Sequence, residues 1–152
     1  MPGVRDALPP TLLGVVIAGT MLAGCGGNGR LSHGDFVKRA DAVCAAYRSA
    51  AGPIARPSTY AQIVAYVNRT LPLYEAARIK LAELKPPAKD AATVRDWLAA
   101  DGRIAAALRD LGRAGLRRDF PAVTTAAANV QAEGVTSRHA AQALGLQVCS
   151  QT

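Results

Sequence analysis

The sequence predicts an all-α protein: a four-helix up-down-up-down bundle with a kinked second helix, following a cleaved N-terminal signal segment. Half of the 152 residues are hydrophobic, but 32 are alanine and only seven are aromatic, so small, helix-favouring side chains dominate. Apolar residues recur at helical spacing in four stretches that glycines and prolines separate. No run of β-branched residues alternates with period two, and a chain of this length fits one domain.

The N-terminal segment, residues 1–24, is predicted to be a lipoprotein signal peptide. Its uncharged run from Thr11 to Ala23 is too short to span a bilayer and is typical of the apolar region of a secretory signal. The four residues Leu22 to Cys25 resemble a bacterial lipobox, in which the peptide is cut before the cysteine and its thiol is acylated. Cys25 is therefore the predicted lipidation site, and residues 25–31 are predicted to be a flexible tether.

The same stretch allows a second interpretation. Gly24, Gly26 and Gly29 match G-x-G-x-x-G, the pattern of a dinucleotide-binding turn. That site needs a parallel sheet around it, and no later stretch has the pattern of strands. We therefore favour the lipobox.

The bundle domain is predicted to occupy residues 32–152, and its first helix begins at the N-cap Ser32, with Asp35 completing a capping box. It is expected to end near Gly52-Pro53, with an apolar stripe of Phe36, Ala40, Val43, Cys44 and Tyr47. The second helix is expected to begin after the cap Ser58 and to end at Lys85-Pro86-Pro87. Pro72 lies within it, which predicts a kink near residues 68–72. Its stripe is Tyr60, Ile63, Val64, Val67, Leu71, Tyr74, Leu81 and Leu84.

The third helix is expected from about Asp90 to Leu111, with a turn at Gly112, Gly115 and Arg117-Arg118. Its inward side carries Val94, Trp97, Leu98, Ile104, Ala105, Leu108 and Leu111. Asp119 is the predicted cap of a fourth helix with Pro121 in its first turn, and Gly145 closes it. Its stripe is unusually small, Val123, Ala127, Val130, Gly134, Ala141 and Leu144, and whether it continues through Gly134 is open.

The chain has three cysteines, which suggests one special thiol and one pair. Cys25 stands apart, whereas Cys44 and Cys149 lie 105 positions from each other without metal-ligand spacing. Up-down-up-down topology brings the end of the fourth helix back toward the first. We expect a Cys44–Cys149 disulfide, which requires an oxidising compartment outside the cytoplasm.

Several of these residues together resemble a group of small secreted lipoproteins common in actinobacteria. They are the lipobox at 22–25, Phe36 with Ala40-Asp41 and Cys44, the Pro86-Pro87 turn, and Leu144-Gly145-Leu146 before Cys149. The resemblance implies an extracytoplasmic helical lipoprotein of generally unassigned activity. It supplies no catalytic residues.

Residues for catalysis or metal binding are sparse. His33 and His139 are the only histidines; with Asp35 they give too few convergent ligands, and we interpret them as exposed residues at helix ends. Asp96 and Asp101 are expected on solvated helix faces, and no serine-nucleophile motif is present. We therefore expect no enzyme, no metal site and no cofactor.

The formal charge is +7, and it stays +7 when residues 1–24 are removed with one Arg and one Asp. A basic protein can bind anionic lipids, acidic cell-wall polymers or nucleic acid. Nucleic acid is excluded as a partner if the chain is exported. Lys80, Lys85 and Lys89 are expected at the membrane-proximal end of the bundle, and Arg109, Arg113, Arg117 and Arg118 at the distal turn. Both clusters fit ordinary helix-end charges or contacts with anionic surfaces.

Tyr60, Tyr66, Tyr74 and Trp97 face a fourth helix lined with alanine and glycine. We expect tight packing there, because small residues let helices approach, with an apolar pocket for a lipid-like ligand around Tyr60, Tyr74 and Trp97 as the alternative. Together these expectations describe a lipoprotein anchored on the outer face of the cell membrane. It acts as a non-enzymatic cell-envelope interaction module through anionic lipids, a cell-wall polymer or an envelope protein, or alternatively as a carrier or sensor of a small apolar ligand.

Overall fold

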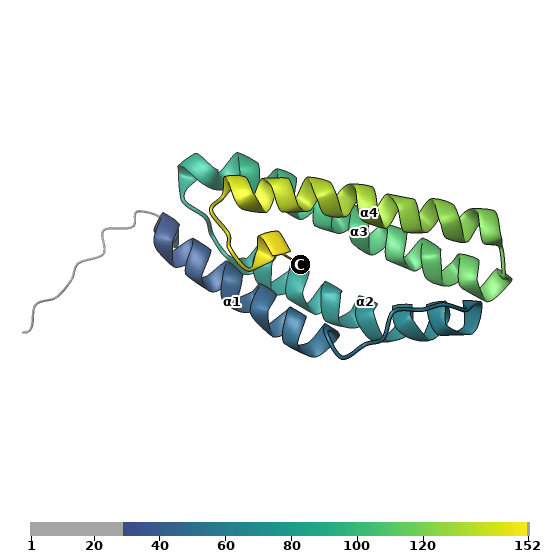
Figure 1. Cartoon of the computed structure of the whole chain (residues 1–152). Helices are drawn as coiled ribbons and strands as arrows, with labels where there is room; N and C mark the ends of the chain where they lie inside the picture. The colour runs from purple at the N-terminus through teal and green to yellow at the C-terminus, as the bar shows by residue number, and fades with distance from the viewer. Residues whose placement is uncertain (1–28, 152) are drawn as a thin grey trace, which may run out of the picture.

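The computed structural model describes residues 29–151, and within that part of the chain every regular element is a helix. Four long helices alternate in direction and pack as two layers, α1 with α2 and α3 with α4 (Figure 1), which confirms the predicted four-helix bundle. Their bounds are α1 His33–Ala51, α2 Tyr60–Glu83, α3 Ala91–Arg117 and α4 Phe120–Ala143, with short 3-10 turns η2 Ala88–Asp90 and η3 Cys149–Gln151. The predicted signal peptide and Cys25 lie outside the described residues.

Side-chain caps begin three of the long helices. Ser32 caps α1, where its Oγ accepts the Asp35 N–H at 3.1 Å, and Asp119 caps α4 by accepting the Ala122 N–H at 3.1 Å, both as predicted. The predicted cap Ser58 is wrong by one residue, because Thr59 Oγ1 accepts the Gln62 N–H at 3.3 Å. The N–H and hydroxyl of Ser58 instead bond to Gln62 Oε1.

The predicted end of the third helix is wrong, because α3 continues through Gly112 and Gly115 to Arg117. Both glycines face α2. A Cβ at Gly112 would lie 3.1 Å from Val67 Cγ1, and one at Gly115 would lie 3.0 Å from Ile63 Cγ2. They therefore let α2 and α3 approach each other.

The remaining helix boundaries follow the pattern of the sequence. α1 ends at Ala51 before Gly52, and α4 runs without a break through Gly134. Pro72 lies inside α2, and the helix continues through it to Glu83. Gly145, with φ +75°, follows the end of α4 and turns the chain back toward α1.

A C-terminal strap, residues 146–151, lies between α1 and α4 (Figure 1). The Asp41 carboxylate on α1 accepts the backbone N–H groups of Gln147, Val148 and Cys149 at 2.9, 2.9 and 3.1 Å. Leu146 is buried, and Cys149 forms the predicted disulfide with Cys44. The strap is thus fixed by side-chain packing, hydrogen bonds and a covalent bond.

Reduction of the disulfide is expected to lower the free energy of unfolding by about 4–5 kcal/mol, because the bond closes a loop with a sequence separation of 105 residues. Urea denaturation of the full chain carrying Cys25→Ser, followed by circular dichroism with and without reductant, measures the difference. The double variant Cys44→Ala/Cys149→Ala is the control and should not respond to reductant. An unchanged denaturation midpoint after verified reduction of the wild-type pair would contradict the expected role.

Candidate functional site

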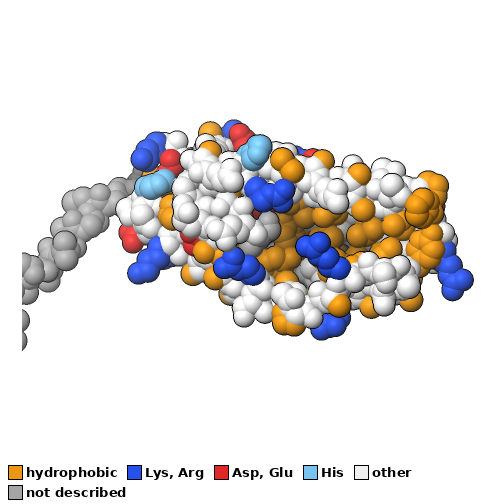
Figure 2. Space-filling model, in the orientation of Figure 1, with side chains coloured by type: hydrophobic (Ala, Val, Ile, Leu, Met, Phe, Trp, Pro, Cys, Tyr) orange, Lys and Arg blue, Asp and Glu red, His pale blue; other side chains and the backbone are white. Residues whose placement is uncertain are grey.

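The two layers of the bundle enclose an apolar pocket of about 280 Å³ that all four helices and the strap line. Tyr47, Tyr66, Tyr74 and Trp97 form its aromatic walls, and α4 contributes the small residue Gly134. Figure 2 shows hydrophobic side chains in the hollow between the layers. The expected tight packing of the aromatic side chains against α4 is therefore wrong.

The pocket exists because α1 and α4 do not pack closely along their length. The strap lies between them, and α1 has 19 residues whereas α2, α3 and α4 have 24, 27 and 24. Small side chains on α4 fill little of the remaining space. The predicted Tyr74 and Trp97 line the pocket, whereas Tyr60, at the first turn of α2, is not part of its lining.

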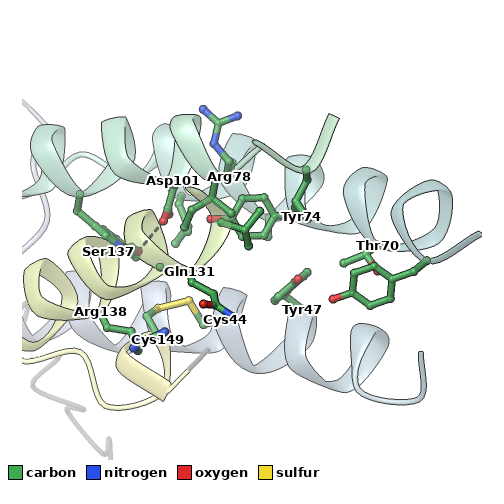
Figure 3. Close-up of a pocket in the computed structure, with 18 residues that line it drawn as sticks. Cys44, Tyr47, Thr70, Tyr74, Arg78, Asp101, Gln131, Ser137, Arg138 and Cys149 are labelled. Carbon is green, nitrogen blue, oxygen red and sulfur yellow. Dashed lines mark hydrogen bonds between the residues drawn. A yellow bond between two sulfur atoms is a disulfide. The ribbon is translucent and has the colours of Figure 1, made fainter. Parts of the chain in front are cut away.

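A chain of hydrogen bonds crosses one wall of the pocket, and Figure 3 shows the bond between Ser137 and Asp101. Trp97 Nε1–H donates to Ser137 Oγ at 3.0 Å, and the Ser137 hydroxyl donates to Asp101 Oδ1 at 2.6 Å. The Tyr74 hydroxyl also bonds to the Asp101 carboxyl. These contacts join α2, α3 and α4 around the carboxyl group of Asp101, a residue that is 5% exposed.

The expectation that Asp101 lies on a solvated face is wrong, because it is on the inward side of α3. Burial raises the pKa of Asp101, while hydrogen bonds from Ser137 and Tyr74 and the charge of Arg78 act in the opposite direction. Burial also raises the pKa of Tyr74, with a further contribution from Asp101. Burial also raises the pKa of Tyr47 to about 12, with a further contribution from Tyr66. The hydroxyl groups of Tyr74 and Tyr47 are therefore neutral at physiological pH.

Two polar atoms of the pocket lining are buried without a hydrogen-bond partner in the described part of the chain. They are Thr70 Oγ1, on a residue that is 3% exposed, and Arg78 Nε. Buried polar atoms in folded proteins nearly always have a partner. The pocket therefore offers unused hydrogen-bonding capacity beside a mostly apolar surface.

The predicted basic clusters lie at opposite ends of the bundle. Lys85 adjoins the first described residues, since the Leu31 N–H donates to the Lys85 carbonyl at 2.8 Å. Lys89 lies in the η2 turn that follows, and Lys80 is exposed in the last turn of α2. The last residues of the predicted tether are therefore held against the bundle. At the other end, Arg117 and Arg118 are exposed at the α3–α4 turn.

Two of the distal arginines have carboxylate partners. Arg113 pairs with Asp110 within α3, and Arg109 pairs with Glu75 of α2. Beside Arg117 and Arg118, the large side chains of Leu116 and Phe120 are 70% and 68% exposed. The distal turn therefore presents charge and apolar surface together.

The histidines do not meet in a metal site. His33 Nδ1 lies 2.7 Å from Asp90 Oδ2, Asp35 bonds to Ser32, and His139 is exposed on α4. Among residues 29–151 no group of three or more histidine, cysteine, aspartate or glutamate side chains is placed to hold a metal. Nor does any helix in that range have the length and apolarity needed to cross a membrane.

No protein-family model, curated protein or solved structure matches this chain.

Helical spacing in the sequence indicates that Asp101 and Ser137 are buried, although the sequence analysis did not predict this. Asp101 follows Trp97 by four positions and precedes Ile104 by three, which places it on the inward stripe of its helix. Ser137 lies three positions after Gly134 and four before Ala141, both assigned to the stripe of the fourth helix. A polar residue at such a position indicates a buried hydrogen-bond network.

Asp101→Asn is expected to stabilise the protein relative to wild type at pH 7 more than at pH 4. The folded state raises the pKa of Asp101, so it binds this proton more tightly than the unfolded state, and wild-type stability falls as pH rises above the unfolded pKa. Asparagine does not titrate and loses this dependence. Urea denaturation at both pH values measures the difference.

Asp96→Asn is the matched control, because Asp96 is exposed on the same helix and pairs only with Arg95. It should change stability little at either pH. A difference between Asp101→Asn and wild type that is the same at both pH values would argue against the electrostatic cost of the buried carboxyl.

Proposed function

We propose that this protein is a lipid-anchored, extracytoplasmic binding protein that carries or senses a small apolar or amphipathic ligand in its bundle core. The pocket between the layers carries the proposal, because aromatic walls surround it and Thr70 Oγ1 and Arg78 Nε are left without partners there. Ligand sites typically combine an apolar cavity with a few polar groups that fix orientation. The proposed role is non-enzymatic and needs no cofactor.

The size of the pocket restricts the ligand. Its volume of about 280 Å³ lies just below the range of about 300–1,000 Å³ that is usual for small-molecule sites. A dry cavity of about 150 Å³ is enough to hold benzene. The proposed ligand is therefore a compact molecule or a single short chain.

Anchoring on the outer face of the cell membrane rests on the lipobox at 22–25 and is supported by the disulfide, which favours an oxidising compartment. Two or three acyl chains on Cys25 would hold the protein firmly, since each buried methylene contributes about 0.8 kcal/mol. Contacts of residues 30 and 31 with the α2–α3 connection would keep the bundle close to the anchor. The resemblance to secreted actinobacterial lipoproteins agrees with this proposal.

Filling the pocket should abolish ligand binding without loss of the fold. Gly134 lines the pocket, and a Cβ there would have only the flexible end of Arg138, Nη1 at 3.4 Å, within 4 Å, so Gly134→Leu adds apolar volume to the pocket lining. Trp97 is the single tryptophan and lines the pocket, so its fluorescence reports occupancy. We expect 1-decanol to shift the emission of wild type and not of Gly134→Leu.

Ala132→Leu, on an exposed position of the same helix, is the matched control and should respond as wild type does. Native mass spectrometry of the protein secreted as Cys25→Ser should also show a co-purified small molecule that the Gly134→Leu variant lacks. An unaltered Trp97 spectrum in wild type, together with no bound mass, would reject the binding function.

A second candidate function is that of a cell-envelope interaction module. It is favoured by the position of Lys85 beside Gly29 and Leu31, with Lys89 in the η2 turn that follows. With Lys80 they would contact anionic headgroups. The distal turn, with Arg113, Arg117 and Arg118 beside exposed Leu116 and Phe120, would meet an acidic cell-wall polymer or envelope protein.

The triple variant Lys80→Ala/Lys85→Ala/Lys89→Ala should weaken salt-sensitive binding of the unlipidated Cys25→Ser chain to phosphatidylglycerol vesicles. Each basic residue near such a surface contributes about 1 kcal/mol. Co-sedimentation at two salt concentrations measures the effect. The control Arg69→Ala/Arg103→Ala/Arg109→Ala removes the same charge from exposed positions away from the proximal end of the bundle. Equal binding by both variants would contradict the proximal contact.

A further inference from the structure

The charged groups around the pocket are unevenly placed. Asp101 is the one carboxyl in the lining, and it is buried and already accepts hydrogen bonds from Ser137 and Tyr74. Arg78 and Arg138 line the same pocket from α2 and α4. Figure 3 shows Arg138 beside Cys149, on the strap side of the pocket and away from Asp101.

Arg138 is the charged group of the lining that lies away from Asp101 and remains available to a ligand. It is partly exposed, and none of the ion pairs among residues 29–151 includes it. Gln131, which lines the pocket from the same helix, is exposed and can donate a further hydrogen bond. Basic side chains also border the hollow in Figure 2.

We propose that the ligand is a small amphipathic acid, with its apolar chain in the aromatic pocket and its anionic head group paired with Arg138 at the mouth. This inference rests on the proposed binding function and names the class of its ligand. The guanidinium group matches a carboxylate or phosphate oxygen pair in geometry as well as in charge. Thr70 Oγ1, deeper in the lining, is free to bond a hydroxyl or carbonyl group along the chain.

A cationic ligand is the opposite possibility, because several aromatic rings around a carboxyl group form the usual cage for an ammonium group. Here the carboxyl of Asp101 is occupied by two hydroxyl donors, and Arg78 lies close enough to interact with it electrostatically. Two guanidinium groups in the lining repel a cation and attract an anion. The balance of charge therefore favours the acid.

Three probes with the same ten-carbon chain test the head group: decanoate, 1-decanol and decyltrimethylammonium. Each is titrated at pH 7.5 into the full chain carrying Cys25→Ser, without detergent, with Trp97 fluorescence and calorimetry as readouts. We expect decanoate to bind about ten-fold more tightly than decanol, and the cation to bind more weakly than decanol. Arg138→Gln should reduce the preference for decanoate over decanol to about two-fold or less.

Arg95→Gln is the matched control, because it removes the same charge from an exposed position outside the pocket and should keep the full preference. Circular dichroism and urea denaturation establish that both variants are folded. Equal affinities for decanoate and decanol, tighter binding of the cation, or an unchanged preference in folded Arg138→Gln would each overturn the inference while leaving a binding function. Failure of all three probes to bind would overturn the proposed function and the inference with it.

Discussion

The attachment of the C-terminal strap to α1 is the constraint on which the rest of the structure depends. One carboxylate, Asp41, accepts three consecutive backbone N–H groups, and the adjacent disulfide makes the attachment covalent. Hydrogen bonds to a charged acceptor are stronger than neutral ones, and consecutive donors require one fixed backbone conformation. The strap therefore has a single position, in which it fills the seam between α1 and α4 at one end of the bundle and leaves the pocket in the remaining space.

The buried network around Asp101 joins α2, α3 and α4. A carboxyl group in an apolar interior is costly, and the hydrogen bonds from Ser137 and Tyr74 offset part of that cost. In return the network requires one register of α2, α3 and α4, because Trp97, Ser137, Asp101 and Tyr74 meet only when the helices are correctly aligned. A core of small side chains packs almost equally well in several registers, so a directional network gives it the specificity that alanine does not.

The features predicted from the sequence were those that depend on local chemistry. Ser32 and Asp119 cap helices because their own side chains reach nearby N–H groups, and the apolar stripes follow from helical periodicity. The disulfide followed from the cysteine count and the topology. Features that depend on a second helix could not be predicted in this way. Gly115 lies inside α3, where it gives room for the close approach of α2, although the sequence suggested a turn there. The pocket likewise depends on where the strap holds α1 relative to α4. Spacing alone could have identified Asp101 as buried, but not the partners that make its burial possible.

The strap also connects stability with the proposed site. Cys44 and Cys149 both line the pocket, so the bond that limits the unfolded chain is itself part of the wall that a ligand would contact. Arg138 lies beside this wall, one residue after Ser137, whose hydroxyl binds Asp101 (Figure 3). Neighbouring residues of α4 thus belong to the buried network and to the proposed mouth of the pocket. Because these residues share one rigid helix, the position of the proposed head-group site is set by the same contacts that fix the register of the core.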